Sequence, residues 1–131
     1  MSEKMRYGCP KCLPDSPDEA WEAGLKLRGR HALIDDSHFH VLIASCPSCG
    51  QPFLWVFSEL IDWQSGDDSQ GWTLMPLTSA EEGELSSGNF FAKGRSVYDL
   101  GEDRRSLWRI HPRGSDVGCS WGLGIPALPH D

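Results

Sequence analysis

Hydrophobic residues in the middle of the chain follow the period of a β-strand. Residues 39–44 are rich in β-branched and aromatic side chains, and so are residues 53–63. Alternation in the second segment places Leu54, Val56 and Leu60 on one face and a larger set on the other: Phe53, Trp55, Phe57, Ile61 and Trp63. Apolar residues on both faces indicate an inner strand covered above and below. With a third strand over residues 72–75, which stops at Pro76, these segments predict an antiparallel meander.

Helix signals flank this meander. Ser16-Pro17-Asp18-Glu19 combines a capping Ser, a Pro at the first helical position and a Glu three residues after the cap, so a short helix is predicted from Pro17 to about Ala23. Residues 78–82 have similar chemistry and predict one or two helical turns before residues 86–88. Residues 25–33 are ambiguous, with a strand as one interpretation. Strands are predicted over 95–100 and 107–111, and residues 112–131, with their Gly and Pro, are predicted to be irregular and draped over the sheet.

Length and composition favour one domain over residues 1–131, of the α+β class. Of the 131 residues, 39% are hydrophobic and 24% are charged, which excludes collagen-like and wholly disordered classes. Neither a membrane-spanning run nor an apolar signal segment is apparent, so we expect a cytoplasmic protein with no membrane partner. Folding at this size hides roughly two-thirds of the unfolded chain's surface. The 14 Gly and 9 Pro further reduce the apolar side-chain area that the core can bury. We therefore expect something besides apolar burial to stabilise the fold.

The charges are segregated along the chain. The formal net charge is -7, and residues 31–92 contain no Lys or Arg. The acidic residues of this block are Asp35, Asp36, Glu59, Asp62, Asp67, Asp68, Glu81, Glu82 and Glu84. Such a block disfavours nucleic acid as a partner and favours a basic protein. The alternative is internal pairing, in which the arginines of the C-terminal part fold back onto the acids: Arg95, Arg104, Arg105, Arg109 and Arg113.

A polar segment over residues 64–71 predicts a solvated hairpin loop between two tryptophans. Trp63 and Trp72 flank this loop and are expected to pair across the strands and brace it. Exposed aromatic residues beside acids are typical of a protein-binding patch. The candidate partner-binding residues are therefore Asp62, Trp63, Asp67, Asp68 and Trp72.

Two Cys-x-x-Cys pairs carry the clearest chemistry. Cys9-Pro10-Lys11-Cys12 and Cys46-Pro47-Ser48-Cys49-Gly50 are separated by 33 residues. The tight turn within each pair directs both sulfurs to the same side, and the Pro fixes the first dihedral of that turn. Four thiolates then surround Zn²⁺ tetrahedrally. The spacing therefore predicts one zinc site formed by Cys9, Cys12, Cys46 and Cys49.

These motifs resemble the zinc-ribbon group, in which two knuckles of the form Cys-Pro-x-Cys, often followed by Gly, clamp one ion at the end of a small antiparallel sheet. The resemblance covers Cys9 to about Trp72. The second motif matches closely, whereas Leu13 stands where the first knuckle would have its Gly. The resemblance implies a structural zinc, a ribbon core over about residues 7–77 with additional strands and an irregular tail over 78–131, and a role in binding.

Other interpretations of the cysteines remain open. Cys46-Pro47-Ser48-Cys49 also resembles a redox pair of the glutaredoxin kind, but such a motif stands singly between a strand and a helix. Structural disulfides are the remaining option. The fifth thiol, Cys119, is expected to be a buried apolar residue, with a surface thiol or substitute ligand as alternatives. Three histidines, His31, His38 and His40, are expected to be solvated or to cap the core, with a second metal site as the alternative.

The sequence thus leads to three hypotheses about function. The first is a non-enzymatic, zinc-stabilised protein-binding module with an acidic central face. One form of it is a small immunity or inhibitor protein that covers a basic toxin or nuclease. The second is a nucleic-acid-binding zinc ribbon that uses the C-terminal arginines. The third is an enzyme or redox protein that uses the thiols, against which a closed four-sulfur shell argues because it leaves no coordination position for water.

Overall fold

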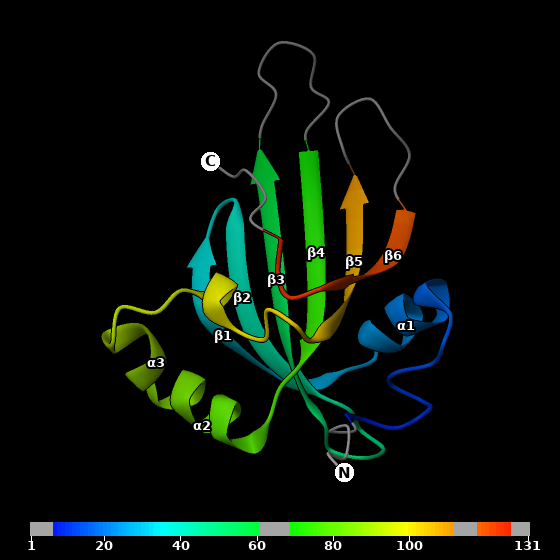
Figure 1. Cartoon of the computed structure of the whole chain (residues 1–131), viewed down its shortest axis with the longest axis horizontal. Coiled ribbons are helices and arrows are strands. Elements are labelled where there is room, and N and C mark those ends of the chain that lie inside the picture. Colours follow the sequence, from blue (N-terminus) through cyan, green and yellow to red (C-terminus); the bar gives the residue numbers. More distant parts are fainter. Residues whose placement is uncertain (1–6, 61–68, 112–117, 127–131) are drawn as a thin grey trace.

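A single antiparallel sheet of six strands organises the chain (Figure 1). The computed structural model describes residues 7–60, 69–111 and 118–126. Spatial order follows chain order, from β1 at one edge to β6 at the other. The strands are β1 (Arg28–Asp36), β2 (Phe39–Ser45), β3 (Pro52–Leu60), β4 (Ser69–Pro76), β5 (Arg105–His111) and β6 (Gly118–Leu123). The α+β class and the central meander expected from the sequence are confirmed.

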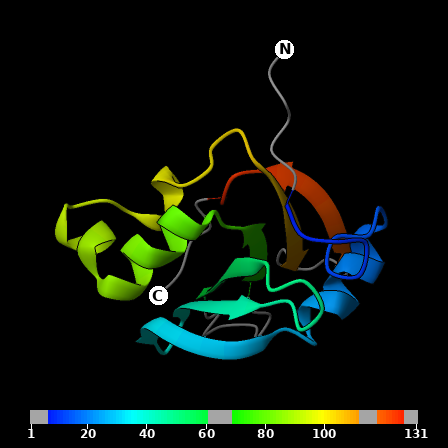
Figure 2. The ribbon, with the colours of Figure 1, turned by 90° about the horizontal axis from the view of Figure 1, so that it is seen from below.

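Helices cover both faces of the sheet (Figure 2). On one side lies α1 (Pro17–Gly24), and on the other lie α2 (Ser79–Ser87), α3 (Asn89–Ala92) and the short 3₁₀ helix η1 (Val97–Asp99). The two faces of β3 divide as the alternation predicts. Leu54 and Val56 pack toward α2 and α3, whereas Phe53 and Trp55 pack toward α1. Because both layers share one sheet, the described residues form a single small domain.

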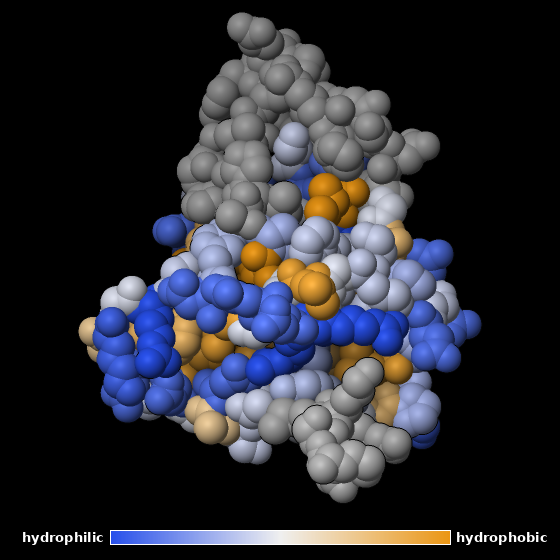
Figure 3. Space-filling view, in the orientation of Figure 1, coloured by the Kyte–Doolittle hydropathy of each residue, from blue (hydrophilic) through white to orange (hydrophobic). Residues whose placement is uncertain are grey.

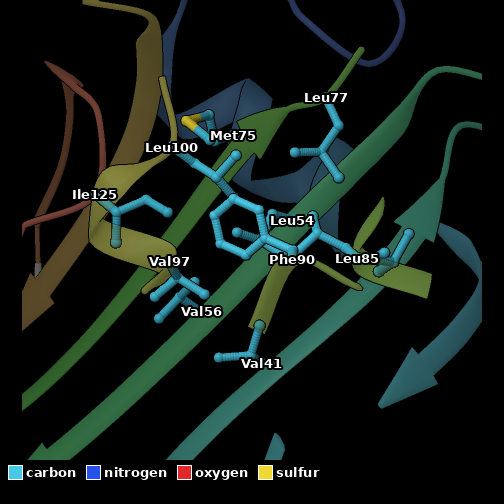
Figure 4. Packing of buried hydrophobic residues seen from close by; sticks show 11 residues of the cluster. Val41, Leu54, Val56, Met75, Leu77, Leu85, Phe90, Val97, Leu100 and Ile125 are labelled. Atoms are coloured by element: carbon cyan, nitrogen blue, oxygen red, sulfur yellow. The ribbon is translucent and has the colours of Figure 1, made fainter. Parts of the chain in front are cut away.

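Two hydrophobic cores result from this arrangement. The core under α2, α3 and η1 is drawn in Figure 4 and includes Val41, Leu54, Met75, Leu85, Phe90, Val97 and Ile125. The core under α1 is richer in aromatic residues. Trp21 of α1 lies 5.3 Å from Trp55 and 5.8 Å from Trp72, measured between ring centroids. Gly24 allows this close approach, because a Cβ there would lie 3.1 Å from a methyl group of Leu74.

The structure overturns two of the expectations. Residues 95–100 do not form a strand: Ser96 caps η1 instead, and the turn buries Val97 and Leu100 against the sheet. The C-terminal part is not wholly irregular, because residues 118–123 form β6 and pair with β5. The ambiguous segment 25–33 becomes a strand from Arg28 onward. In each case the missing information is the neighbouring chain segment, since a strand is stabilised by the pairing of its backbone and a turn by the core that it covers.

No helix in the described parts of the chain has the length and hydrophobicity required to cross a membrane.

An ion pair joins α2 to the end of the sheet. Glu81 accepts two hydrogen bonds from the Arg104 guanidinium, at 2.7 Å from Nη1 and 3.1 Å from Nη2. Arg104 Nη1 also donates to the carbonyl oxygen of Pro76, and Glu81 completes a capping box with Thr78. Burial alone would raise the pKa of the Glu81 carboxyl, but the hydrogen bonds from Arg104 and Thr78 outweigh it and lower that pKa. The carboxylate form is therefore favoured by folding.

We predict that Glu81→Gln destabilises the protein at neutral pH by about 1–2 kcal/mol, because Gln keeps the cap acceptor but loses the charge. Since folding lowers the Glu81 pKa from its ordinary value of 4.5, the wild-type advantage is complete above that value. The advantage disappears as the pH falls through the lower, folded-state pKa. Urea titrations across this range measure it, with Glu82→Gln as the control. A wild-type advantage that does not shrink in acid would contradict the argument.

A tryptophan packs flat over a glycine where β5 meets β6. A Cβ added to Gly122 would lie 2.4–2.7 Å from ring atoms of Trp108. The indole Nε1 of Trp108 donates to Ser106 Oγ at 2.9 Å and to the carbonyl oxygen of Gly124 at 3.1 Å. The ring is therefore held in place and cannot move aside without breaking hydrogen bonds.

Gly122→Ala is expected to destabilise the fold by about 1–3 kcal/mol, because the new methyl group overlaps a fixed ring. Gly118→Ala, in the same strand, meets no atom within 4 Å and serves as the matched control. Chemical denaturation of the two variants and the wild type compares them directly. Equal stability of both variants would show that Trp108 is free to move.

Candidate metal centre

Four cysteine sulfurs converge at one end of the sheet. The sulfur ligand atoms of Cys9, Cys12, Cys46 and Cys49 all lie within 4.8 Å of one another. The Sγ–Sγ distances are 3.8 Å for Cys9–Cys12, 3.9 Å for Cys9–Cys46 and 3.8 Å for Cys12–Cys49. Sulfurs placed about 2.3 Å from a central Zn²⁺ in a tetrahedron stand about 3.8 Å apart. The spacing of these donors therefore fits a tetrahedral metal ion.

The two knuckles reach this point from different parts of the fold. Cys9 and Cys12 lie in the segment that leads into α1, and Cys46 and Cys49 lie in the turn that joins β2 to β3. In the second knuckle, Gly50 has a φ of 80° and donates its N–H to the carbonyl oxygen of Cys46 at 2.9 Å. The positive φ is available to Gly without steric cost. This Gly stands at the position where the motif resembles a ribbon knuckle.

The first knuckle has its glycine before the cysteines. Gly8 has a φ of 66°, and a Cβ there would lie 2.6 Å from the Sγ of Cys12. Leu13 occupies the place equivalent to Gly50 and donates its N–H to the carbonyl oxygen of Cys9 at 2.9 Å. Its side chain packs into the core under α1. The first knuckle thus makes the same hydrogen bond as the second without a glycine at that place.

Gln51 links the two knuckles to the sheet, a role that the sequence analysis missed. Its Oε1 accepts the N–H of Gly8 at 2.9 Å. Its Nε2 donates to the carbonyl oxygens of Pro52, at 2.7 Å, and Leu77, at 2.8 Å. No sequence motif marks this residue, because two of its partners, Gly8 and Leu77, lie in segments that are distant in the sequence.

Hydrogen bonds and burial shift the pKa values of the four thiols in different directions. The backbone N–H of Cys12 lowers the pKa of Cys9 to about 7, whereas burial raises the pKa of Cys12 well above its ordinary value. Burial opposes ionisation of Cys46, but N–H groups of Cys49 and Ser48 outweigh it and lower the pKa. Desolvation raises the pKa of Cys49. Each knuckle thus has one thiol whose pKa is lowered and one whose pKa is raised.

The geometry bears on the two competing interpretations of the cysteines. A disulfide requires sulfurs about 2.05 Å apart, far closer than the Sγ–Sγ separations of 3.8–3.9 Å. A glutaredoxin-like pair lies between a strand and a helix, whereas the Cys46–Cys49 turn joins two strands. Four sulfurs of a tetrahedral shell leave no open coordination position, so such a site would hold the two segments together without activating water.

A second metal site is not found among the histidines of the described residues. His38, in the turn between β1 and β2, and His40 of β2 contact different carboxylates: His38 Nδ1 lies 3.0 Å from Glu59, and His40 Nδ1 lies 3.0 Å from Asp35. Within the described parts of the chain, the four cysteines form the one group of three or more potential ligands. The fifth thiol, Cys119, is half-buried on the sheet face beside Arg109, 3.5 Å from its Nη1, so the expectation of a fully buried thiol is not met.

The C-terminal arginines are largely occupied by internal contacts. Arg104 pairs with Glu81, and Arg95 Nη1 lies 3.7 Å from Glu84. The guanidinium of Arg109 lies over the rings of Trp21 and Trp72, and that of Arg105 lies 3.8 Å from the ring centre of Trp121. Arg113 lies outside the described residues. The internal pairing considered from the sequence is therefore present at Glu81 and Glu84. Hydrophilic side chains cover α2 and α3 in the view of Figure 3.

The candidate partner-binding residues are only partly described. Trp72 is half-buried on the sheet face, 5.3 Å from Phe57 between ring centroids. Asp62, Trp63, Asp67 and Asp68 lie outside the described residues, so the expected pairing of Trp63 with Trp72 stays a prediction. Of the neighbouring acids, Asp35 and Asp36 are exposed at the turn between β1 and β2.

No family model, curated protein or solved structure matches this chain. The interpretation of the site rests on its own residues and their geometry.

Removal of the metal is expected to unfold the protein, because a structural Zn²⁺ site contributes on the order of 10 kcal/mol, comparable to the whole stability of a small domain. A strong chelator should abolish the cooperative thermal transition of the wild type. Cys12→Ser should prevent stoichiometric metal binding, whereas Cys119→Ser should leave it intact. Circular dichroism melts and elemental analysis measure both effects. A melt that chelation leaves unchanged would show that these sulfurs do not stabilise the fold through a metal.

Proposed function

We propose that this protein is a non-enzymatic binding module of the zinc-ribbon type. In this proposal Cys9, Cys12, Cys46 and Cys49 hold one structural Zn²⁺, and the opposite, acidic end of the sheet binds a basic protein. The observation that carries the proposal is the separation of these two features along the strands. The cysteine knuckles lie at the end of β2 and β3 where Ser45 pairs with Pro52, and the exposed Asp35 and Asp36 lie at the other end.

The donor set supports zinc. Tetrahedral sites with four sulfurs bind zinc or iron, and two knuckles that close one shell are typical of structural zinc. The position of the second knuckle at the tip of the β2–β3 hairpin supports the ribbon type, because it places the ion at the end of an antiparallel sheet. We expect the protein to act in the cytoplasm, where thiols remain reduced and available to the metal.

The charge distribution supports a basic protein as the partner. Asp35 and Asp36 are exposed at the β1–β2 turn, and Asp62, Asp67 and Asp68 follow β3 in the sequence, which leaves the sheet at the same end. Strands β2, β3 and β4 contain no Lys or Arg. An acidic surface accelerates association with a basic partner. An immunity or inhibitor protein that covers a basic toxin or nuclease is one form of this function.

The nucleic-acid alternative has less support. A phosphate-binding surface needs Lys and Arg side chains that are free to replace counterions. The contacts of Arg104 with Glu81 and of Arg109 with Trp21 hold these two side chains within the fold, and Arg95 pairs with Glu84 at the surface. Binding of nucleic acid would need these contacts to break.

Charge reversal at the acidic end tests the proposal. In protein isolated from its native cells, we expect Asp35, Asp36, Asp62, Asp67 and Asp68→Lys to reduce recovery of a basic partner at least about tenfold, because attraction becomes repulsion. Glu19 and Glu22→Lys on the exposed side of α1 is the matched control and should retain the partner. Quantitative mass spectrometry at low and high salt measures recovery. Equal recovery with both variants would contradict the acidic-end proposal, and recovery of nucleic acid in place of protein would favour the alternative.

A further inference from the structure

The two edges of the sheet differ in how they resist pairing with another strand. The edge strand β1 has two register irregularities against β2 and carries charged side chains, among them Arg28, Arg30, Asp35 and Asp36. Irregular register and charge on an edge strand discourage further pairing. The other edge strand, β6, pairs with β5 without a register shift and contains no charged residue and no Pro. In the described parts of the chain, β6 therefore lacks the charge and the irregular register that protect β1.

Backbone groups of β6 point away from the sheet. Gly124 donates its N–H to the carbonyl oxygen of Arg104, so these two residues form a hydrogen-bonded pair that continues the antiparallel β5–β6 register. In such a register, hydrogen-bonded pairs alternate with pairs whose backbone groups point outward. By alternation, Gly118, Ser120 and Gly122 bond to β5, and the N–H and C=O groups of Cys119, Trp121 and Leu123 point outward. In the described parts of the chain, these outward groups have no backbone partner from another segment. Leu123 is also 61% exposed, the larger value of the two exposed large hydrophobic residues in the described parts of the chain.

We infer that β6 pairs antiparallel with β6 of a second copy of this chain, extending the sheet across a twofold axis near Trp121. This pairing satisfies the outward groups of both copies. It places Trp121 beside its counterpart and Leu123 beside Cys119 of the other copy, all on the same face. Because β6 is uncharged, no like charges meet along the pairing strands. A strand of the same apolar character is what this edge fits, and every copy presents one.

The side chain at the centre of this edge is already positioned. Trp121 Nε1 donates to the carbonyl oxygen of Asp15 at 2.9 Å, and Arg105 lies over its ring. A fixed side chain loses little conformational entropy on association. The inference does not depend on the acidic end or on the partner proposed for it, so the two can fail separately.

Sedimentation equilibrium of the metal-loaded full chain tests this pairing, with a phosphine reductant present so that Cys119 forms no disulfide. The wild-type mass should rise from one chain toward two as concentration increases. Leu123→Lys should weaken association at least about tenfold, because it places a charge on the edge. Leu25→Lys is the matched control, since Leu25 is the other exposed large hydrophobic residue, 48% exposed on the far end of α1, and it should associate as the wild type does.

Two further measurements keep the test independent of folding defects. Ser120→Lys, at a second exposed position of β6, should also give a folded, weakly associating protein. Hydrogen exchange should show the amides of Cys119, Trp121 and Leu123 becoming protected as wild-type concentration rises, whereas those of Ser120 and Gly122 are protected throughout. A mass of one chain at every concentration would overturn the inference. So would association that both Lys variants of β6 leave unchanged.

Discussion

Convergence of the two cysteine knuckles is the constraint on which the rest of the structure depends. It joins the start of the described chain to the β2–β3 turn across a spacer of 33 residues, which contains α1, β1 and β2. Closing a loop of this length costs conformational entropy, which contacts between residues near in sequence offset only in part. A metal held by the four sulfurs would supply that free energy at one point, and Gly8, Gly50 and Gln51 shape the backbone so that the sulfurs can meet there.

This junction also determines where α1 lies. The helix follows the first knuckle directly, so the junction brings it to the face of the sheet that α2 and α3 leave open. Trp21 then packs against Trp55 and Trp72, and Arg109 lies over Trp21. A short helix of eight residues is marginal by itself. Its stability therefore comes from the aromatic core beneath it and from the anchoring of the segment that precedes it.

Some acidic side chains pair with arginines of the fold, and others face solvent. On α2, the acids face arginines that are distant in sequence, which stabilises the end of the sheet near Pro76. At the β1–β2 turn, Asp36 remains exposed and Asp35 contacts only a partly exposed histidine. Exposed acids also lie near the sulfurs, because Glu19 and Glu22 of α1 line the same hollow as Cys12 and Cys46. This division explains how one acidic block contributes to both stability and a candidate binding surface.

Several features could be predicted from residues that are near one another in the chain: the alternation that divides β3 between two cores, the caps of α1 and α2, and the spacing by which each knuckle presents two sulfurs to one point. The turn at residues 95–100 and the edge strand at residues 118–123 could not be predicted in this way, because backbone pairing and burial depend on neighbours in space. The same holds for Gln51 and for the arginines, whose roles are set by partners from distant segments.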